Sequence, residues 1–360
     1  MKKSLLIALF CGFGGAMATF AQEPAESQQV KYLNEKPSEY ISVFQYWKEH
    51  NIFQHLDASI SLGTTGVGVD LSSPIGNNFQ LRAGFSFMPK FDYRMNFGVE
   101  MSEHNDQSTY NRLSTILGNL TGYEVHNSVD MIGEPTWNNA HVLIDVFPFK
   151  NKHWHFTAGF FVGGSKVAKA TNSIEDMATL LALGAYNKMY DKAVVYEPIV
   201  KDIDLGKINY TLDDPDILDK FHDNFSYYGR MGVRIGDYAH DIYDENGDLV
   251  HAKGTPYMVE PDENGMVKVN VKANSFRPYL GFGYGGRLFK NSDKYKVSFD
   301  CGAMFWGGTP SIYTHDGTNL SKDVENIGGK VGTYVDLIKA FKVFPVLNLR
   351  LSGTLFETEA

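Results

Sequence analysis

The sequence predicts an all-β protein, a transmembrane antiparallel β-barrel of about eight strands with a large mixed α/β loop insert. Three observations lead to this prediction. The chain begins with an export signal, no later stretch is long and apolar enough for a membrane-spanning helix, and several segments alternate at the period of a β-strand. Ten strands remain an alternative.

The first 21 residues have the pattern of a secretory signal peptide. A short positive start precedes an uncharged stretch from Leu5 to Ala21, which ends in a small-x-small motif. This stretch is shorter than the ~20 apolar residues that a membrane span needs. We therefore expect cleavage after Ala21, export, and an outer-membrane location. Only Cys301 then remains, so no intramolecular disulfide can form.

The composition excludes some classes of protein. The chain has 360 residues and a formal net charge of -9, with 42 Asp and Glu against 33 Lys and Arg. This acidic balance argues against nucleic acid as a partner, because phosphate groups need a basic surface. The charged fraction of 21% excludes wholesale disorder.

Period-two alternation marks the strands one by one. It runs through 79–88, 91–101, 140–146, 154–163, 280–288, 295–305 and 347–355. A first strand spans 56–72, where the apolar phase shifts by one residue between Gly63 and Gly66. Either a β-bulge restores the facing, or this stretch is two short strands.

The polar face of these strands favours a barrel over a soluble sandwich. It carries glycines and charges of both signs, which suit a narrow barrel interior. The expected polar network of the lumen comprises Arg82, Asp92, Arg94, Glu100, Asp145, Arg287, Lys296, Asp300 and Arg350.

The lengths of the connections are a separate signal. From the third onward, long connections alternate with short ones, as in bacterial barrels with long extracellular loops and short periplasmic turns. The first connection, 73–78, is too short for this pattern. The resulting organisation is 1–21 signal peptide, 22–55 periplasmic helical segment, 56–164 first barrel strands, 165–275 extracellular acidic insert, 276–356 closing strands and 357–360 tail.

Two strand motifs carry a resemblance to a known group. These are FRPYLGFGYG at 276–285 and FPVLNLRL at 344–351. With the alternation over 56–100, 139–165 and 276–356, they resemble Bacteroidota-type outer-membrane β-barrel proteins, most of which have no defined function. The resemblance implies outer-membrane lipid and the barrel insertion machinery as partners.

The 165–275 insert has features of its own. Residues 174–189 read as a helix, and the tetrapeptide Asp-Glu-Asn-Gly occurs at both 244–247 and 262–265, which predicts two hairpins. Between 202 and 263 acids outnumber bases about three to one, so a surface ligand or protein partner is expected there. Asp244, Asn246 and Asp248 resemble part of a calcium loop, but its twelfth position holds Thr255. We predict no metal site and no cofactor.

The sequence gives only weak support for a catalytic function. His141 and His155 are the candidates, but no HExxH, G-x-S-x-G or phosphate-binding loop is present. We predict a non-enzymatic barrel that presents its acidic insert for binding. The alternatives are a narrow porin-like pore and a lipid A-modifying or proteolytic barrel enzyme.

Overall fold

The computed structural model describes residues 42–103, 107–122, 124–195, 215–340 and 342–357. The predicted signal peptide and the predicted helix start at Pro37 lie outside these ranges. Within the expected 22–55 segment, the structure contains helix α2, Val43–Glu49.

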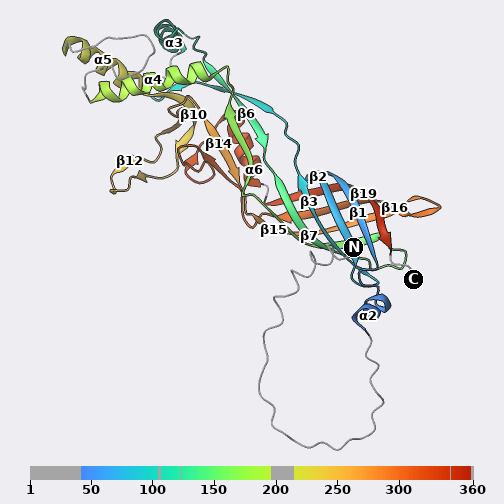
Figure 1. Ribbon diagram of the computed structural model, residues 1–360. Helices are drawn as coiled ribbons and strands as arrows, with labels where there is room; N and C mark the ends of the chain where they lie inside the picture. The colour runs from blue at the N-terminus through green and yellow to red at the C-terminus, as the bar shows by residue number, and fades with distance from the viewer. Residues whose placement is uncertain (1–41, 104–106, 123, 196–214, 341, 358–360) are drawn as a thin grey trace, which may run out of the picture. The chain divides into compact units, whose positions relative to one another are not determined.

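Eight antiparallel strands close into a barrel (Figure 1). The strands are β1 His55–Gly63, β2 Gly66–Pro74, β3 Phe79–Phe87, β7 Asn138–Val146, β8 Trp154–Gly163, β15 Phe276–Phe289, β16 Ser292–Phe305 and β19 Val343–Glu357. Each strand pairs with its neighbours in the order β1-β19-β16-β15-β8-β7-β3-β2, and β2 returns to β1. The fold class and the predicted strand number are confirmed.

The prediction reached eight strands through two errors that offset each other. The count of eight took 56–72 as one bulged strand, but the structure has the other alternative, two strands. Gly63 pairs with Gly66 across a two-residue turn, and Gly66 has φ +92°, which glycine adopts without strain. This turn shifts the apolar phase by one residue, so that Leu62 and Val67 pair on the same face.

The second error concerns 91–101, which lies outside the barrel. Its residues form β4, Tyr93–Gly98, and β5, Glu100–Met101, which pair with β6 and β10. A half-buried strand of any antiparallel sheet has the same period of two as a barrel strand. The alternation therefore predicted a strand correctly and its sheet incorrectly.

With these corrections, the three long connections all begin and end at the same end of the barrel. The turn 64–65 and the long connections 88–137, 164–275 and 306–342 lie at one end of the barrel, which we call the long-loop end. The short connections 75–78, 147–153 and 290–291 lie at the other end, with the first residue of β1 and the last of β19. The anomalously short first connection is therefore a short turn at the correct end.

The outer face of the barrel is a continuous apolar surface. Outward side chains from all eight strands are large, apolar and exposed. They include Ile60, Leu62, Val69, Leu71, Phe85, Val142, Ile144, Phe156, Phe160, Leu280, Phe282, Phe299, Leu347, Leu349 and Leu351. A surface of this kind on a monomer in water would be far larger than the patches that soluble proteins expose.

Cys301 provides a direct test of this facing. Cys301 follows the inward Asp300 along β16. Its cross-strand partners are Phe282 and Leu347, which both point outward. We expect a membrane-impermeant maleimide to leave Cys301 unlabelled in intact membranes and to label it after denaturation. Rapid labelling of the folded protein in membranes would contradict the outward, lipid-facing position.

The long connections build a second body of β-structure, which we call the module. Its larger sheet has five strands in the order β17-β14-β9-β6-β4, with β17 Ser311–Thr314, β14 Lys268–Lys272, β9 Lys166–Asn172 and β6 Ser128–Pro135. A second sheet has the order β13-β10-β18, with β13 Pro256–Val259, β10 Met231–Tyr238 and β18 Val324–Glu325, and β5 also pairs with β10.

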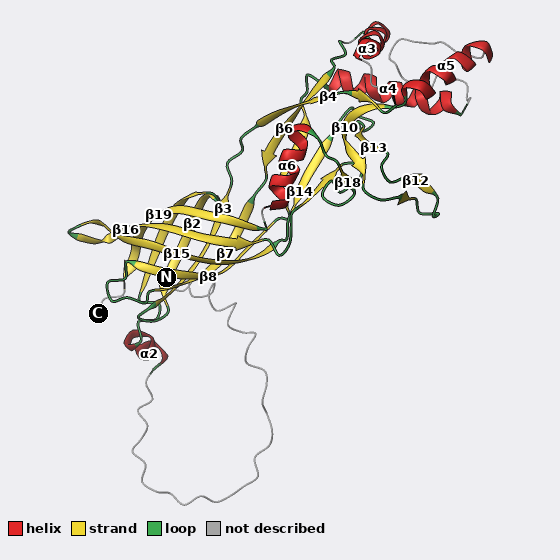
Figure 2. Ribbon diagram, turned by 180° about the vertical axis from the view of Figure 1, so that it is seen from behind, coloured by secondary structure: helices red, strands yellow, loops and turns green. Residues whose placement is uncertain are grey.

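Four helices accompany these sheets among the described residues (Figure 2). They are α3 Gln107–Thr121, α4 Met177–Val194, α5 Pro215–Tyr228 and α6 Gly329–Ala340. Helix α4 corresponds to the helix predicted at 174–189, displaced toward the C-terminus. In the part of the chain that the structure describes, no helix combines the length and apolarity needed to cross a membrane.

The two predicted hairpins have different outcomes. Around 244–247 the chain does form a hairpin, between β11 Ile242–Tyr243 and β12 Leu249–His251. Residues 262–265 form a turn in which the amide of Met266 bonds Asp262, but the flanking β13 and β14 pair with other strands. The second hairpin prediction is therefore wrong, because distant partners take both strands.

Candidate functional site

A buried ion network occupies the middle of the barrel lumen. Arg82 donates to Asp145 at 2.9 Å and lies 3.5 Å from Asp300. Arg350 lies 3.2 Å from Asp300 and 3.8 Å from Asp145. All four side chains are at most 7% exposed. Two arginines and two aspartates balance one another, so the network needs no further ion.

Both candidate catalytic histidines belong to the lumen. The Nε2 atom of His155 lies 2.7 Å from Asp300, at the edge of the ion network. His141 contacts Asp70 in the same way, through its Nε2 atom, four residues before Asp145 on β7. Each histidine is buried and held by a carboxylate of the barrel wall. This arrangement orients the rings and fills the lumen.

Aromatic side chains fill the lumen at the long-loop end. Trp137 and Trp306 pack with ring centroids 5.1 Å apart, and both indoles are buried. Tyr279 packs edge-on against Phe161 just below them. The guanidinium of Arg277, fully buried, lies 5.7 Å and 5.6 Å from the two indole rings. Side chains therefore fill the lumen from the ion network to this end.

The opposite end of the lumen is open as a recess of about 1050 Å³. Its walls carry more cations than anions, and Lys296 pairs with the buried Asp57 at 3.7 Å. The cations lining it are Lys150, Lys152, Arg287, Lys290, Lys296 and Arg350. The recess ends at His155 and Arg350, where the ion network begins.

The predicted lumen residues divide into two groups. Arg82, Asp145, Asp300 and Arg350 meet in the ion network, and Arg287 and Lys296 lie at the recess. The other three require correction. Asp92, Arg94 and Glu100 belong to the segment that left the barrel: Asp92 is exposed before β4, Arg94 pairs with Glu175 at 3.7 Å, and Glu100 lies in β5.

The weak metal candidates Asp244, Asn246 and Asp248 form the turn of the β11–β12 hairpin. The Oδ1 atom of Asp244 accepts hydrogen bonds from the backbone amides of Asn246 and Asp248, at 2.9 and 2.8 Å. These bonds lower the pKa of the Asp244 carboxyl from its ordinary value. Among the described residues no cluster of three or more metal-ligating side chains is found.

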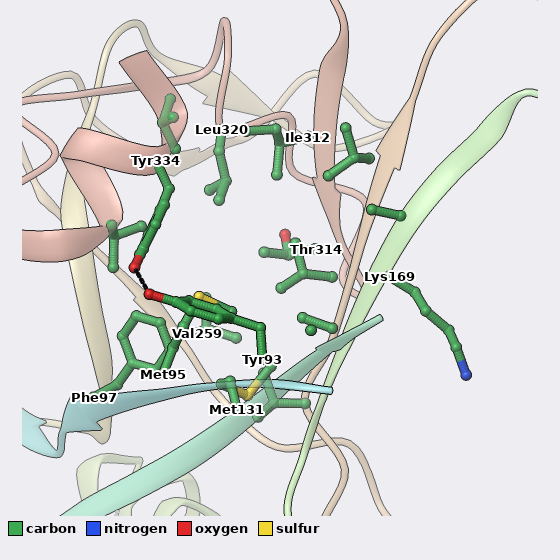
Figure 3. Close-up of a pocket in the computed structure, with 18 of the residues that line it drawn as sticks. Tyr93, Met95, Phe97, Met131, Lys169, Val259, Ile312, Thr314, Leu320 and Tyr334 are labelled. Atoms are coloured by element: carbon green, nitrogen blue, oxygen red, sulfur yellow. Dashed lines mark hydrogen bonds between the residues drawn. The ribbon is translucent and has the colours of Figure 1, made fainter. Parts of the chain in front are cut away.

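The module contains an apolar cavity of about 350 Å³ (Figure 3). One face of the five-stranded sheet forms the floor of the cavity. Residues that pair with one another across the five strands form a row along this floor. The row runs Tyr93, Gly133, Ala170, Val269, Thr314. The second sheet contributes Val233, Ile235 and Val259, and helix α6 contributes Val331, Tyr334, Val335 and Ile338.

The space exists because the centre of the floor is made of small residues. Gly133 and Ala170 are direct register partners on the central strands β6 and β9, and Ala168 lies two positions before Ala170. Larger side chains at these positions would fill the face. A space of about 350 Å³ therefore remains above the floor.

The polar groups at the cavity are already bonded to one another. The hydroxyls of Tyr93 and Tyr334 share a hydrogen bond of 2.7 Å (Figure 3). Thr314 Oγ1 donates to Asp316 at 2.6 Å. Burial alone would raise the pKa of Asp316, but hydrogen bonds, chiefly from Thr314, outweigh it and hold the pKa below its ordinary value. Lys169 points away from the cavity and pairs with Glu134 at 3.0 Å.

Sequence reasoning missed this cavity and several lumen residues. Asp70 was available from the alternation of β2, since it lies between the outward Val69 and Leu71. Arg277 lies two residues before Tyr279 on the same face of β15. The cavity left no signal of its own, because its floor combines five strands that are distant in the sequence.

Comparison with known proteins adds little to this description. No family model matches the sequence, and no curated protein matches it. Among solved structures, the chain is similar to CarO2 and CarO of Acinetobacter baumannii, each at 14% identity with a TM-score of 0.33. The alignments cover 83% of this chain, 98% of CarO2 and 97% of CarO. A likeness this loose carries no argument, and the Bacteroidota-type resemblance stays a prediction.

Proposed function

We propose that the protein is a non-enzymatic outer-membrane barrel that anchors a ligand-binding module at the cell surface. The observation that carries the proposal is the apolar cavity in a module built by the long connections of a barrel whose lumen is filled at its centre and long-loop end. The barrel holds the module in place, and the module binds the ligand.

The apolar outer face supports a membrane location. Hydrocarbon offers no hydrogen bonds, so a spanning sheet must close on itself, as these eight strands do. The outward row Leu62, Leu349 and Phe299 crosses three neighbouring strands and is wholly apolar. Such a face is stable against lipid and unstable in water.

The connections support the orientation. In single-chain bacterial barrels both termini face the periplasm and the long loops face outward. Here β1 begins and β19 ends at the short-turn end, opposite the three long connections. This arrangement supports a module on the outside of the cell, where its β11–β12 hairpin would present exposed Asp244, Glu245 and Asp248.

The filled lumen favours an anchor over the pore alternative. Eight strands enclose a space that side chains can fill. Arg82, Asp145 and their partners fill its centre, and the aromatic side chains fill the long-loop end. Neither of the candidate histidines contacts the module's cavity, so the enzyme alternative gains no support from it.

We expect the full-length protein to show no single-channel conductance in planar bilayers, because side chains fill the centre and the long-loop end of the lumen. On intact cells, external trypsin should cut the module at exposed sites such as Lys253 and leave the barrel heat-modifiable on gels. Resolved channel openings would overturn the anchor in favour of the pore. A module protected in intact cells and cut only after the outer membrane is opened would overturn the orientation.

A further inference from the structure

The cavity of the module determines the chemistry of its ligand. We propose that it binds an uncharged hydrocarbon segment, such as an alkyl chain. This inference rests on the proposed function, because it identifies the ligand class of the same module.

The lining excludes a charged or strongly polar ligand. Aliphatic and aromatic side chains supply nearly all of the wall, from strands β4, β6, β9, β14 and β17, the second sheet and helix α6. A buried polar group without a partner is costly. The few polar side chains there already bond each other or a neighbour, Tyr93 to Tyr334 and Thr314 to Asp316, so a ligand hydroxyl or carboxylate inside the cavity would find few partners.

Among the described residues, one ion pair lies at the cavity, and its charged groups are directed away from the space. Lys169 and Glu134 lie next to the floor residues Ala170 and Gly133 in the chain, and neighbours along a strand point to opposite faces. Figure 3 shows the ammonium of Lys169 directed away from the space. A charged head group, where the ligand has one, therefore stays outside, and only the hydrocarbon part is enclosed.

The floor fits this ligand class. Gly133, Ala168 and Ala170 present little more than backbone and methyl groups at the centre, while larger side chains surround them. The volume of about 350 Å³ lies within the range of small-molecule pockets, ~300–1,000 Å³. An apolar occupant supplies the packing contacts that the small residues leave unmade.

Photo-labelling of the full-length protein in outer-membrane vesicles tests the inference. One arm uses a straight-chain alcohol that carries a diazirine, and the other uses a phospholipid with a diazirine in its acyl chain. Labelled peptides are located by mass spectrometry. We expect label in the cavity segments 129–135 and 267–271. The arm that labels them identifies the source, a free small molecule or a membrane lipid.

The outer face of the barrel is the internal control. Peptides of β3 and β19 should be labelled in both arms, because their outward side chains face lipid. Unlabelled alcohols of increasing length should compete for the cavity about tenfold better for every two methylenes added. Label on the barrel with none in the cavity overturns the inference and leaves the anchor intact. No label on the barrel overturns the proposed function itself.

A matched pair of variants locates the label within the cavity. Ala170→Trp should abolish labelling of the cavity segments, because the indole fills the floor. Thr171→Trp, one residue later on the opposite face of β9 and not among the residues that line the cavity, should leave it unchanged. Unchanged cavity labelling in Ala170→Trp overturns the inference. The smaller Ala168→Leu should reduce labelling in part. A trypsin cleavage pattern of the module identical to that of the unmodified protein verifies that each variant folds.

Discussion

Asp145→Ala is expected to lower the free energy of unfolding by about 3–5 kcal/mol, the range for removal of one partner of a buried ion pair. Asp145 is fully buried, and its carboxylate lies 2.9 Å from Arg82 and 3.8 Å from Arg350. Without it, two buried guanidinium groups share the single carboxylate of Asp300. Reversible urea unfolding in lipid vesicles, followed by tryptophan fluorescence, measures the loss.

The control removes a carboxylate from an exposed pair. Glu134 pairs with Lys169 at 3.0 Å on the outside of the module, where both side chains are partly exposed. Glu134→Ala should cost at most about 1 kcal/mol, as exposed pairs do. Equal losses in the two variants would mean that Asp145 is not part of a desolvated network.

A double variant separates the cost of an unpaired charge from the worth of the network. Arg82→Met with Asp145→Leu removes one cation and one anion together, and Arg350 keeps Asp300 at 3.2 Å. Apolar replacements of a complete buried pair are often neutral or stabilising. We expect this variant to be more stable than Asp145→Ala alone. A lower stability would show that the network itself, and not charge balance, stabilises the barrel.

The sequence predicted those features of the barrel that depend on local pattern. Alternation located β3, β7, β8, β15, β16 and β19, because each has one face toward the apolar surroundings and one toward the lumen. The same pattern placed Arg82 and Arg350 on the polar face. It could not pair them with Asp145 and Asp300, because these contacts depend on the closure of the barrel and on strand register.

The errors have a common physical cause. Period-two alternation records that one side of a strand is buried, and it does not record which sheet the strand joins. Segment 91–101 has an apolar face directed into the module's cavity, where Tyr93, Met95 and Phe97 lie. Arg94, on its opposite face, is exposed to solvent rather than enclosed in a lumen.

The cavity could not be predicted from the pattern of any single segment for a further reason. Gly133 and Ala170 come together only because β6 pairs with β9, and Val269 joins them only because β14 pairs with β9. More than 130 residues separate Gly133 from Val269 along the chain. Small residues in strands are common, and nothing in their own segments distinguishes a cavity floor from a packed core.

Leu349→Arg is expected to destabilise the protein by about 2–4 kcal/mol, the cost of a lipid-facing arginine at the membrane midplane. Leu349 lies near the middle of β19 and is 56% exposed. Its register partners, Leu62 and Phe299, are outward and apolar, so no polar side chain of this row is available to the guanidinium. Urea unfolding in lipid vesicles measures the difference from the unmodified protein.

Two control variants distinguish the charge from the position. Leu349→Ala removes apolar area without adding a charge, so it should cost less than Leu349→Arg. Ser352→Ala changes the opposite face of the same strand, where Ser352 pairs with Ser59 and Lys296 toward the lumen, and it should cost little. If arginine at position 349 cost no more than alanine there, the apolar face would be in contact with water or another protein surface, and the membrane anchor would have to be abandoned.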